Sequence, residues 1–418
     1  MTKVYLKTYG CAHNQSDSEY MAGVLKQNDF ELVQSKKSAD IVVFNTCTVK
    51  DPSEKKIYSE LDRLDKPVVV AGCVPQADKK NSELKKYSLL GVNQLSQIAE
   101  VVEQTLAGNT VHLLKRSRAQ DMALPKVRRN NLIEIIPISS GCMGYCTFCK
   151  TKQARGGLSS HKPKEIIKRF RQALNEGVKE VWLTSEDTGP YGLEIKTTLP
   201  ELLRELLKIK KDFRIRLGMI NPEYVSKYFD ELVDIYQDDR MFKFLHIPVQ
   251  SGDNQVLKDM NREYAVEEFK EVVDKIRQKV PNITIATDII CGFPTESEEA
   301  FGRTLDLVRE LQFPIINFSK FYPRPGTKAA KMDLLPTRIV KSRSKKLTEL
   351  NNSLDVNEDW IGWKGEVLVD EKGKKGTFLA RNDYYKQVVL EGDFSLGDRI
   401  FVKVTDGTRD YLVAVPER

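Results

Sequence analysis

Apolar runs alternate with helical repeats along the first part of the chain. Strands are predicted at residues 4–8, 41–45 and 68–71, where apolar residues follow one another directly. Helices are predicted at residues 16–27 and 52–64 from the spacing of apolar positions. Strands and helices in alternation are typical of a mostly parallel sheet with helices on its faces. The pattern therefore predicts an N-terminal open α/β sheet domain at residues 1–110.

The same alternation repeats six times in the centre of the chain. Strands are predicted at residues 132–138, 180–185, 213–218, 243–248, 282–288 and 314–320. Helices are predicted at residues 163–175, 199–208, 263–278 and 296–312, and a basic helix follows at residues 336–354. Six strand–helix units indicate a partial (βα)6 barrel of the TIM type, which we place at residues 132–355.

The pattern changes again after residue 355. Short apolar runs separated by Gly, Asp and Asn predict strands at residues 366–370, 377–380, 387–391, 399–404 and 411–415. Such runs are typical of a small antiparallel β-barrel, which we place at residues 356–418. Aromatic and basic residues in this domain form a candidate RNA-binding patch, which comprises Phe378, Arg381, Tyr384, Tyr385 and Lys386.

Composition narrows the class of protein. No apolar run approaches the ~20 residues that cross a bilayer, and the N-terminus lacks a signal peptide's apolar segment, so we expect a cytoplasmic protein without membrane contact. A formal net charge of +7 permits an anionic partner. The basic linker at residues 111–131 is either a solvated tether or a contact to a polyanion. Seven cysteines, an odd number, favour metal or redox use over disulfides.

Three of these cysteines lie within nine residues with C-x3-C-x2-C spacing. They are Cys142, Cys146 and Cys149, here called the loop triad. Three thiolates on a cubane iron–sulfur cluster leave the fourth iron without a protein ligand, which makes that iron available for chemistry. The alternatives are a structural zinc site or three unrelated buried thiols. Zinc usually takes four protein ligands, and no fourth Cys or His lies within ten residues of Cys149.

Three further cysteines each follow a predicted strand of the N-terminal sheet. They are Cys11, Cys47 and Cys73, here called the strand-end triad. The carboxyl ends of parallel strands share one edge, so we expect the three thiols to converge and to hold a second cluster with one open iron. The alternative is that each is a small buried residue. We interpret Cys291, at the end of an apolar strand, as a core residue.

With both triads and the three domains placed, nearly the whole chain resembles the radical-SAM methylthiotransferases. That family combines an N-terminal cluster domain, a radical S-adenosylmethionine (SAM) barrel and a C-terminal TRAM domain. The residues that carry the resemblance are 9–11, 17–19, 45–49, 72–76, 141–149 and 248–252. Residues 149–152, 183–189 and 321–327 are similar to the archaeal and eukaryotic branch, which converts N6-threonylcarbamoyladenosine next to the tRNA anticodon into its 2-methylthio derivative.

The resemblance implies two [4Fe-4S] clusters and SAM as cofactors, with all six triad cysteines as catalytic ligands. The loop triad would hold the cluster that cleaves SAM to a 5′-deoxyadenosyl radical, and the strand-end triad would hold the auxiliary cluster that presents a sulfur. A second SAM would methylate that sulfur, and the radical would abstract hydrogen at C2 of the adenine. Candidate SAM contacts are Phe148, Ser185, Glu186, Arg216 and Gln250. Ser185 and Glu186 are at the position where related enzymes bind the SAM amino group, and Phe148, Arg216 and Gln250 each have a structural role as the alternative.

The implied partners are the tRNA anticodon stem-loop, SAM, an unidentified electron donor and an unidentified sulfur source, and we expect a monomer. The basic linker, the basic helix at residues 336–354 and the C-terminal patch would contact tRNA phosphates. Three alternatives remain. They are methylthiolation of another acceptor, such as isopentenyladenosine in tRNA or a ribosomal-protein aspartate; methylation without sulfur; and a non-catalytic iron–sulfur protein that binds RNA.

Overall fold

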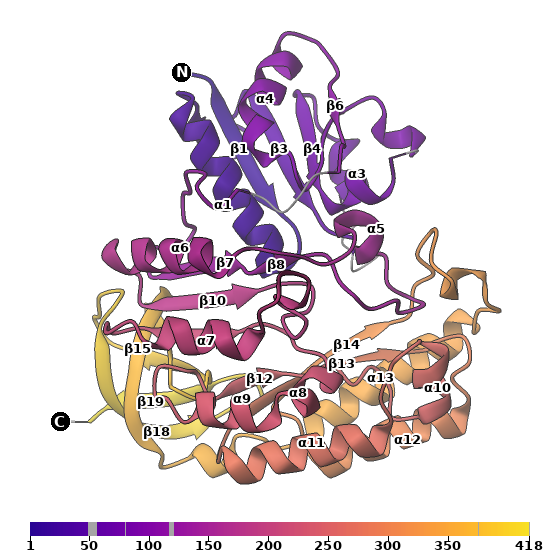
Figure 1. Cartoon of the computed structure of the whole chain (residues 1–418), viewed down its shortest axis with the longest axis vertical. Helices are drawn as coiled ribbons and strands as arrows, with labels where there is room; N and C mark the ends of the chain where they lie inside the picture. Colours follow the sequence, from indigo (N-terminus) through magenta and orange to yellow (C-terminus); the bar gives the residue numbers. More distant parts are fainter. Residues whose placement is uncertain (49–56, 80, 117–120, 375, 418) are drawn as a thin grey trace. The chain divides into compact units, whose positions relative to one another are not determined.

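The computed structural model describes residues 1–48, 57–79, 81–116, 121–374 and 376–417, which fall into two compact units (Figure 1). The first unit comprises Met1–Ala173, Leu183–Leu199 and Tyr322–Ala330. The second comprises Leu174–Trp182, Pro200–Phe321 and Lys331–Arg418. No helix within the described ranges combines the length and apolar character needed to span a bilayer.

A parallel sheet of six strands forms the N-terminal part of the first unit, as predicted. Its order is β2-β1-β3-β4-β5-β6, with β1 Lys3–Thr8, β2 Glu31–Leu32, β3 Ile41–Thr46, β4 Val68–Gly72, β5 Ser88–Leu90 and β6 His112–Leu113. Strands β3 and β4 are buried along their whole length, as expected for central strands covered on both faces. The sequence pattern missed β2, β5 and β6 because each has only two or three residues, and β6 lies within the expected linker.

Two helices, α1 (Ala12–Gln27) and α4 (Ile98–Leu106), cover one face of this sheet (Figure 1). Helix α1 begins directly after Cys11, four residues before the predicted start at Ser16. The periodicity missed its first turn because the buried residues there, His13 and Asn14, are polar. Of the helix predicted at residues 52–64, residues 57–61 are helical, and residues 52–56 lie outside the described part of the chain.

The rest of the first unit carries the loop triad. Its elements are β7 (Ile133–Pro137), β8 (Ser139–Ser140), α5 (Thr151–Arg155), β9 (Ser159–Ser160) and most of α6 (Pro163–Asn175). Strand β8 pairs with β9, and the cysteine loop lies between β8 and α5. The amide of Ile138 donates to the carbonyl of Thr184 at the end of β10 (Glu180–Thr184) over 2.9 Å.

Part of the expected linker is packed inside the first unit. The Lys126 ammonium is buried and lies 3.1 Å from Glu19 and 2.9 Å from Glu134. Arg128 also pairs with Glu134. The expectation of a polyanion contact is therefore wrong for Lys126, whose side chain is fully buried. For Arg128, which is partly exposed, it stays a prediction. Residues 117–120 of the linker lie outside the described part of the chain.

The remaining predicted strands of the central domain lie in the second unit. They are β11 (Arg214–Leu217), β12 (Phe244–His246), β13 (Thr284–Cys291) and β14 (Ile315–Lys320). Strand β11 neighbours β10, and β12-β13-β14 form a parallel sheet. The helices here are α7 (Leu199–Leu207), α8 (Pro222–Lys227), α9 (Phe229–Tyr236), α10 (Asn254–Asp259), α11 (Val266–Lys279), α12 (Glu298–Leu311) and α13 (Thr337–Ser353). Cys291 is fully buried in β13, as expected for a core residue.

Five strands at the C-terminus close into a barrel, shown in orange and yellow in Figure 1. The closed order is β15-β16-β17-β19-β18, with β15 Lys364–Lys372, β16 Thr377–Arg381, β17 Gln387–Glu391, β18 Arg399–Gly407 and β19 Leu412–Pro416. The barrel was expected to be wholly antiparallel, and this is wrong at one pair, because β17 and β19 run parallel. A parallel pair is not joined by a simple hairpin, and β18 lies between the two strands in the sequence.

Candidate active site

The loop triad lines an open cavity in the first unit. The cavity has a volume of about 340 Å³, and all three cysteines of the triad line it. The Gly144 amide donates to Cys142 Sγ over 3.3 Å, and a Cβ placed on Gly144 would lie 3.5 Å from that sulfur and 3.9 Å from Cys146 Sγ. Burial raises the pKa of Cys142 to about 12, and the nearby Asp187 carboxylate adds to the effect. The thiolate is therefore disfavoured unless a metal compensates its charge.

The strand-end triad converges around Asn14, in the first turn of α1. Cys11 Sγ lies 3.4 Å from Asn14 Oδ1, and Cys73 Sγ lies 3.9 Å from Asn14 Nδ2. A Cβ placed on Gly10 would come within 2.6 Å of Cys47 Cβ, so glycine is needed where these loops meet. Cys47 and Cys73 are buried and Cys11 is exposed. Strands β1, β3 and β4 therefore bring together three thiols that are far apart in sequence.

The donor atoms of each triad are of the kind that iron–sulfur clusters bind. Over the described ranges, no group of three or more His, Cys, Asp or Glu side chains is arranged around one metal ion. A cubane cluster does not need such an arrangement, because its thiolate ligands bind different irons. Soft thiolates are the ligands that select such clusters. Each triad therefore offers three thiols that are chemically suited to such a cluster.

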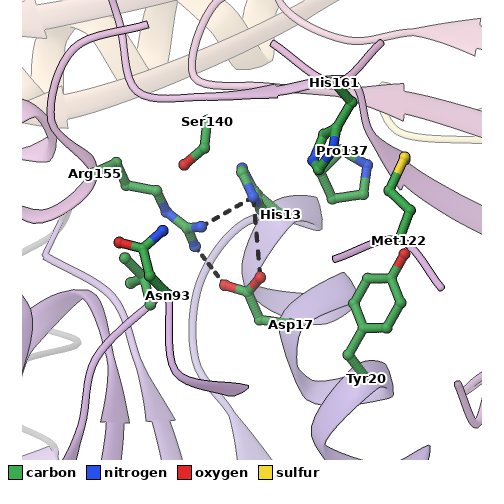
Figure 2. A pocket seen from close by; sticks show the side chains of 10 residues that line it. His13, Asp17, Tyr20, Asn93, Met122, Pro137, Ser140, Arg155 and His161 are labelled. Carbon is green, nitrogen blue, oxygen red and sulfur yellow. Dashed lines mark hydrogen bonds and ion pairs between the residues drawn. The ribbon is translucent and has the colours of Figure 1, made fainter. Parts of the chain in front are cut away.

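A buried ionic network connects the loops that carry the two triads, and Figure 2 shows its contacts among His13, Asp17 and Arg155. Glu186 accepts a hydrogen bond from the amide of Gly141, directly before Cys142, over 2.7 Å. It also lies 2.9 Å from His13 Nδ1 and 3.3 Å from Arg155 Nε. Arg155, at the end of α5, donates to Asp17 over 2.5 Å and to His13 Nε2 over 2.9 Å. The cysteine loop, α5 and α1 are thus joined through charged side chains.

The same network shapes the electrostatics of Glu186. Burial alone raises the pKa of this carboxyl group, but His13, Arg155 and the Gly141 amide outweigh burial and hold the pKa below its usual value. Glu186 therefore stays ionised, with three protein partners around it. Its expected contact with the SAM amino group stays a prediction.

A small polar pocket lies beside the network, and Figure 2 shows its lining. His13, Asp17, Ser140, Arg155 and His161 contribute polar groups to it. Its volume of about 10 Å³ admits about one water molecule and excludes a nucleoside. Burial lowers the pKa of His161 to about 4, so this imidazole is neutral at pH 7. The pocket therefore belongs to the packing beneath the cysteine loop.

The other expected SAM contacts have separate surroundings. Ser185 shares a 2.7 Å hydrogen bond with Ser139, and Phe148 is half-buried within the cysteine loop. In the second unit, the Arg216 guanidinium lies 5.0 Å from the Phe244 ring and 5.4 Å from the Trp182 ring. Arg216 is thus held among aromatic rings.

Gln250 adopts a left-handed backbone conformation beside β13. Its φ angle is +70°, which is uncommon for a residue other than glycine. The backbone amide of Gln250 donates to the backbone carbonyl of Asp288 over 2.8 Å. The backbone carbonyl of Gln250 accepts from the backbone amide of Ile290 over 2.9 Å. Nearby, His246 Nε2 lies 2.9 Å from Asp288 Oδ1. Two backbone hydrogen bonds therefore hold Gln250 in this conformation.

Two residues of the expected RNA-binding patch, Phe378 and Lys386, are buried, and all five make contacts within the second unit. The Tyr385 ring centroid lies 5.0 Å from that of Phe242 and 4.8 Å from that of Phe244. Arg381 pairs with Asp370, Lys386 donates to Asn357, Tyr384 packs on Trp360, and Phe378 packs on Phe394. Arg381, Tyr384 and Tyr385 are partly exposed, so an RNA contact through these three stays a prediction. The aromatic and basic composition that suggested RNA binding therefore has a structural use.

The basic helix α13 is partly internal as well. Arg343 is buried and pairs with Glu296 over 2.8 Å. Arg338, Lys341, Lys345 and Lys346 are exposed on the same helix, and the last two pair with Glu349 and Glu298 at the surface. These four residues therefore remain candidates for tRNA phosphates.

Several residues of the site were not identified from the sequence. His13, Asn14, Asp17 and Arg155 carried no assigned role, although Asp17 lies in one of the segments that carry the family resemblance. The spacing of His13 and Asp17 by four residues places them on one helix face, and this was the available signal. Nothing in the local sequence marks Arg155 as the partner of Asp17, because 138 positions separate the two residues.

Comparison with known proteins adds independent information. Residues 3–90, 136–308 and 361–416 match the families described as Uncharacterized protein family UPF0004, Radical SAM superfamily and TRAM domain, respectively. The cobalamin- and [4Fe-4S]-bound structure of the radical S-adenosylmethionine methyltransferase TsrM from Kitasatospora setae is similar, with a TM-score of 0.54, 14% identity, and coverage of 79% of this chain and 77% of that one. This likeness supports the predicted fold of the central domain.

Curated relatives match over nearly the whole chain. The threonylcarbamoyladenosine tRNA methylthiotransferase of Drosophila melanogaster is 47% identical, over 98% of this chain and 77% of the relative. The enzyme of that name from Homo sapiens is 43% identical, over 99% of this chain and 74% of the relative. A probable threonylcarbamoyladenosine tRNA methylthiotransferase from Pyrococcus horikoshii is 42% identical, over 93% of this chain and 94% of the relative. The resemblance seen in the sequence is thereby confirmed, and this chain belongs to the threonylcarbamoyladenosine tRNA methylthiotransferase family.

Proposed function

We propose that this protein converts N6-threonylcarbamoyladenosine next to the tRNA anticodon into its 2-methylthio derivative by radical SAM chemistry. The observation that carries the proposal is the presence of two separate groups of three cysteines within one compact unit. The curated relatives bear the name of this activity. Replacement of an unactivated aromatic C–H bond by a C–S bond requires chemistry that side chains do not supply, so cofactors must carry it.

The loop triad and the strand-end triad would each hold one [4Fe-4S] cluster. When bound, the two clusters and SAM supply the radical, the sulfur and the methyl group. The thiols must lose their protons as the clusters bind, since the thiolate is the ligand. The exposed Cys11 gives the strand-end triad access to solvent and substrate. These roles of the six cysteines, and the SAM contacts of Phe148, Ser185, Glu186, Arg216 and Gln250, are part of the proposal.

The remaining side chains of the site would hold the loops in place. Glu186 fixes the amide before Cys142, and Arg155 fixes α5 against Asp17 of α1. Arg155 and Asp17 are buried, so these contacts limit the access of water to the region between the loops. Pre-organisation of this kind is what a reaction with a radical intermediate requires, because stray water and side chains would quench it.

Several expectations remain part of the proposal. The domain limits at residues 1–110, 111–131, 132–355 and 356–418, the monomeric state and the cytoplasmic location are among them. The tRNA anticodon stem-loop, an electron donor and a sulfur source are the proposed partners. Exposed cations such as Arg338 and Lys341 would bind tRNA phosphates.

Mass spectrometry of tRNA nucleosides tests the reaction and the acceptor together. Anaerobically reconstituted, reduced protein is incubated with SAM and tRNA that carries threonylcarbamoyladenosine. We expect a nucleoside heavier by one methylthio group. SAM cleavage without this product would contradict the acceptor, and parallel reactions would then test isopentenyladenosine tRNA and the ribosomal-protein aspartate. A product heavier by a methyl group alone would show methylation without sulfur, and no SAM cleavage at all would favour the RNA-binding alternative.

A further inference from the structure

The loop that carries the loop triad exposes two large side chains to solvent. Tyr145 is 69% exposed and Met143 is 46% exposed, although both lie between cluster cysteines. Single exposed apolar side chains are common on protein surfaces, but here two lie in one loop beside a cavity, and exposed apolar groups that occur together mark interaction sites. The three thiols of this triad line an open cavity, so solvent has access to them.

Three cations line the cavity next to this loop. They are Arg116, Lys152 and Lys328. Among the residues that the structure describes, no Asp or Glu lines this cavity. Lys152 Nζ lies 3.2 Å from the centroid of the Tyr145 ring, and Arg116 donates to the Gln153 carbonyl over 2.7 Å. The cavity edge is therefore positively charged.

Backbone contacts hold these groups in place. Lys152 donates to the carbonyls of Met143 over 3.2 Å and Gly144 over 3.1 Å, so its charge is held over the cysteine loop. The Ala329 amide donates to the Thr147 carbonyl over 2.9 Å, which places the exposed Lys328 beside the same loop. Backbone contacts thus hold Lys152 and the segment of Lys328 beside the cysteine loop, so the positive charge has a defined position there.

We propose that an acidic one-electron carrier protein docks on this loop surface, which comprises Arg116, Met143, Tyr145, Lys152 and Lys328. The proposal rests on the proposed function, which requires a reductant for the cluster held by the loop triad. One electron leaves the reduced carrier and enters that cluster, and no bond forms or breaks in this step. A carrier with carboxylates around its redox centre complements the three cations electrostatically.

The composition of the surface favours a protein carrier over RNA. Met, Tyr and Arg are enriched at protein interfaces, and redox partners form small, transient contacts. A tRNA backbone is bound through many phosphate contacts, whereas this surface offers three cations beside exposed apolar groups. Docking here also places the carrier directly over the loop that holds the three cysteines.

Charge reversal at the cavity edge tests the docking. Arg116→Glu and Lys328→Glu are chosen, and Lys152 is left intact because it holds the loop backbone. Lys164→Glu, at an exposed position on α6, is the matched control. The probe is a reduced acidic flavodoxin, and dithionite is the small reductant that needs no docking. The readouts are the rate of cluster reduction, followed by visible absorbance, and the flavodoxin affinity measured by titration.

We expect the double variant to be reduced by flavodoxin about tenfold more slowly, to bind it more weakly, and to be reduced by dithionite at the wild-type rate. The Lys164→Glu control should match wild type with both reductants. Unchanged reduction by flavodoxin, or equal slowing with both reductants, overturns the proposal. Weaker tRNA binding together with normal flavodoxin reduction also overturns it and assigns the surface to RNA. Failure of the proposed function gives a different result from failure of the docking proposal. If the proposed function is wrong, wild-type protein reduced by dithionite will not cleave SAM.

Discussion

Arg155 donates a 2.5 Å hydrogen bond to Asp17, and this contact joins the helix after the loop triad to the helix after Cys11. The preceding residue, Ala154, packs in one apolar cluster with Cys73. The short helix α5 thus contacts elements that carry two of the strand-end cysteines. The two triads therefore belong to one packed structure, although the sequence places them in different domains.

Removal of Arg155 should destabilise the first unit. Arg155→Ala leaves the buried carboxylates of Asp17 and Glu186 without their shared cation, which costs about 3–5 kcal/mol in the free energy of unfolding. Denaturant unfolding measures the loss. Arg155→Lys should lose less, because the charge remains, and the exposed Arg171→Gln on α6 serves as control. A loss below about 1 kcal/mol would show that the network contributes little.

Replacement of the strand-end triad should separate the two roles of the cysteines. The triple variant Cys11→Ala, Cys47→Ala, Cys73→Ala keeps the loop triad, so we expect SAM cleavage to continue and methylthiolation to stop. Iron bound per chain should fall by roughly half, because one of two proposed clusters is removed. Iron analysis and nucleoside mass spectrometry provide the readouts. Full methylthiolation by this variant would contradict the proposal that the protein uses two clusters.

Tyr385 should contribute to stability and not to RNA binding. Its ring packs on Phe242, Phe244 and the Arg381 guanidinium, so Tyr385→Ala should cost about 3–5 kcal/mol. Tyr385→Phe keeps the ring and should cost far less. Thermal unfolding and tRNA titration at a temperature where both variants remain folded check this. Weaker tRNA binding by Tyr385→Ala with wild-type stability would restore the original RNA-binding interpretation.

Glu180 should make the second unit less stable as pH rises from about 4.5 to about 7. Burial, with the Asp370 charge, raises the pKa of Glu180 to about 7, although Arg381 opposes this. Between those pH values the folded state binds a proton that the unfolded state has released, so the free energy of unfolding falls as pH increases, by about 3 kcal/mol at most. Denaturant unfolding of wild type and Glu180→Gln at several pH values tests this. Identical pH profiles for the two proteins would contradict the prediction.

Exposed cations of α13 should contribute to tRNA affinity through phosphates. Arg338→Glu and Lys341→Glu are expected to weaken tRNA binding and to lower the slope of log affinity against log salt by about one for each phosphate that is no longer neutralised. Titrations at several salt concentrations measure both quantities. Lys210→Glu, at another exposed position of the second unit, provides the comparison. A salt slope that stays at the wild-type value in both variants would exclude these residues from the interface.

Much of the architecture could be predicted because its signals are local. Strands β1, β3 and β4 are continuous apolar runs, and the cysteines that follow them must reach one edge of a parallel sheet. The loop triad is likewise visible in nine consecutive residues. Strands of two or three residues, such as β2 and β6, carry too short a pattern to be recognised.

The sequence by itself determined the order of elements, the two cysteine triads and the family, because each depends on residue type and spacing along the chain. Only the tertiary structure decided which charged and aromatic residues face solvent. Lys126 and Tyr385 are residue types that nucleic-acid surfaces use, yet Lys126 pairs with Glu19 and Tyr385 packs on Phe244, both distant in sequence. The physical reason is that a lysine or tyrosine has the same local pattern in either environment. Its partner, and therefore its role, is set by contacts that form only when the chain folds.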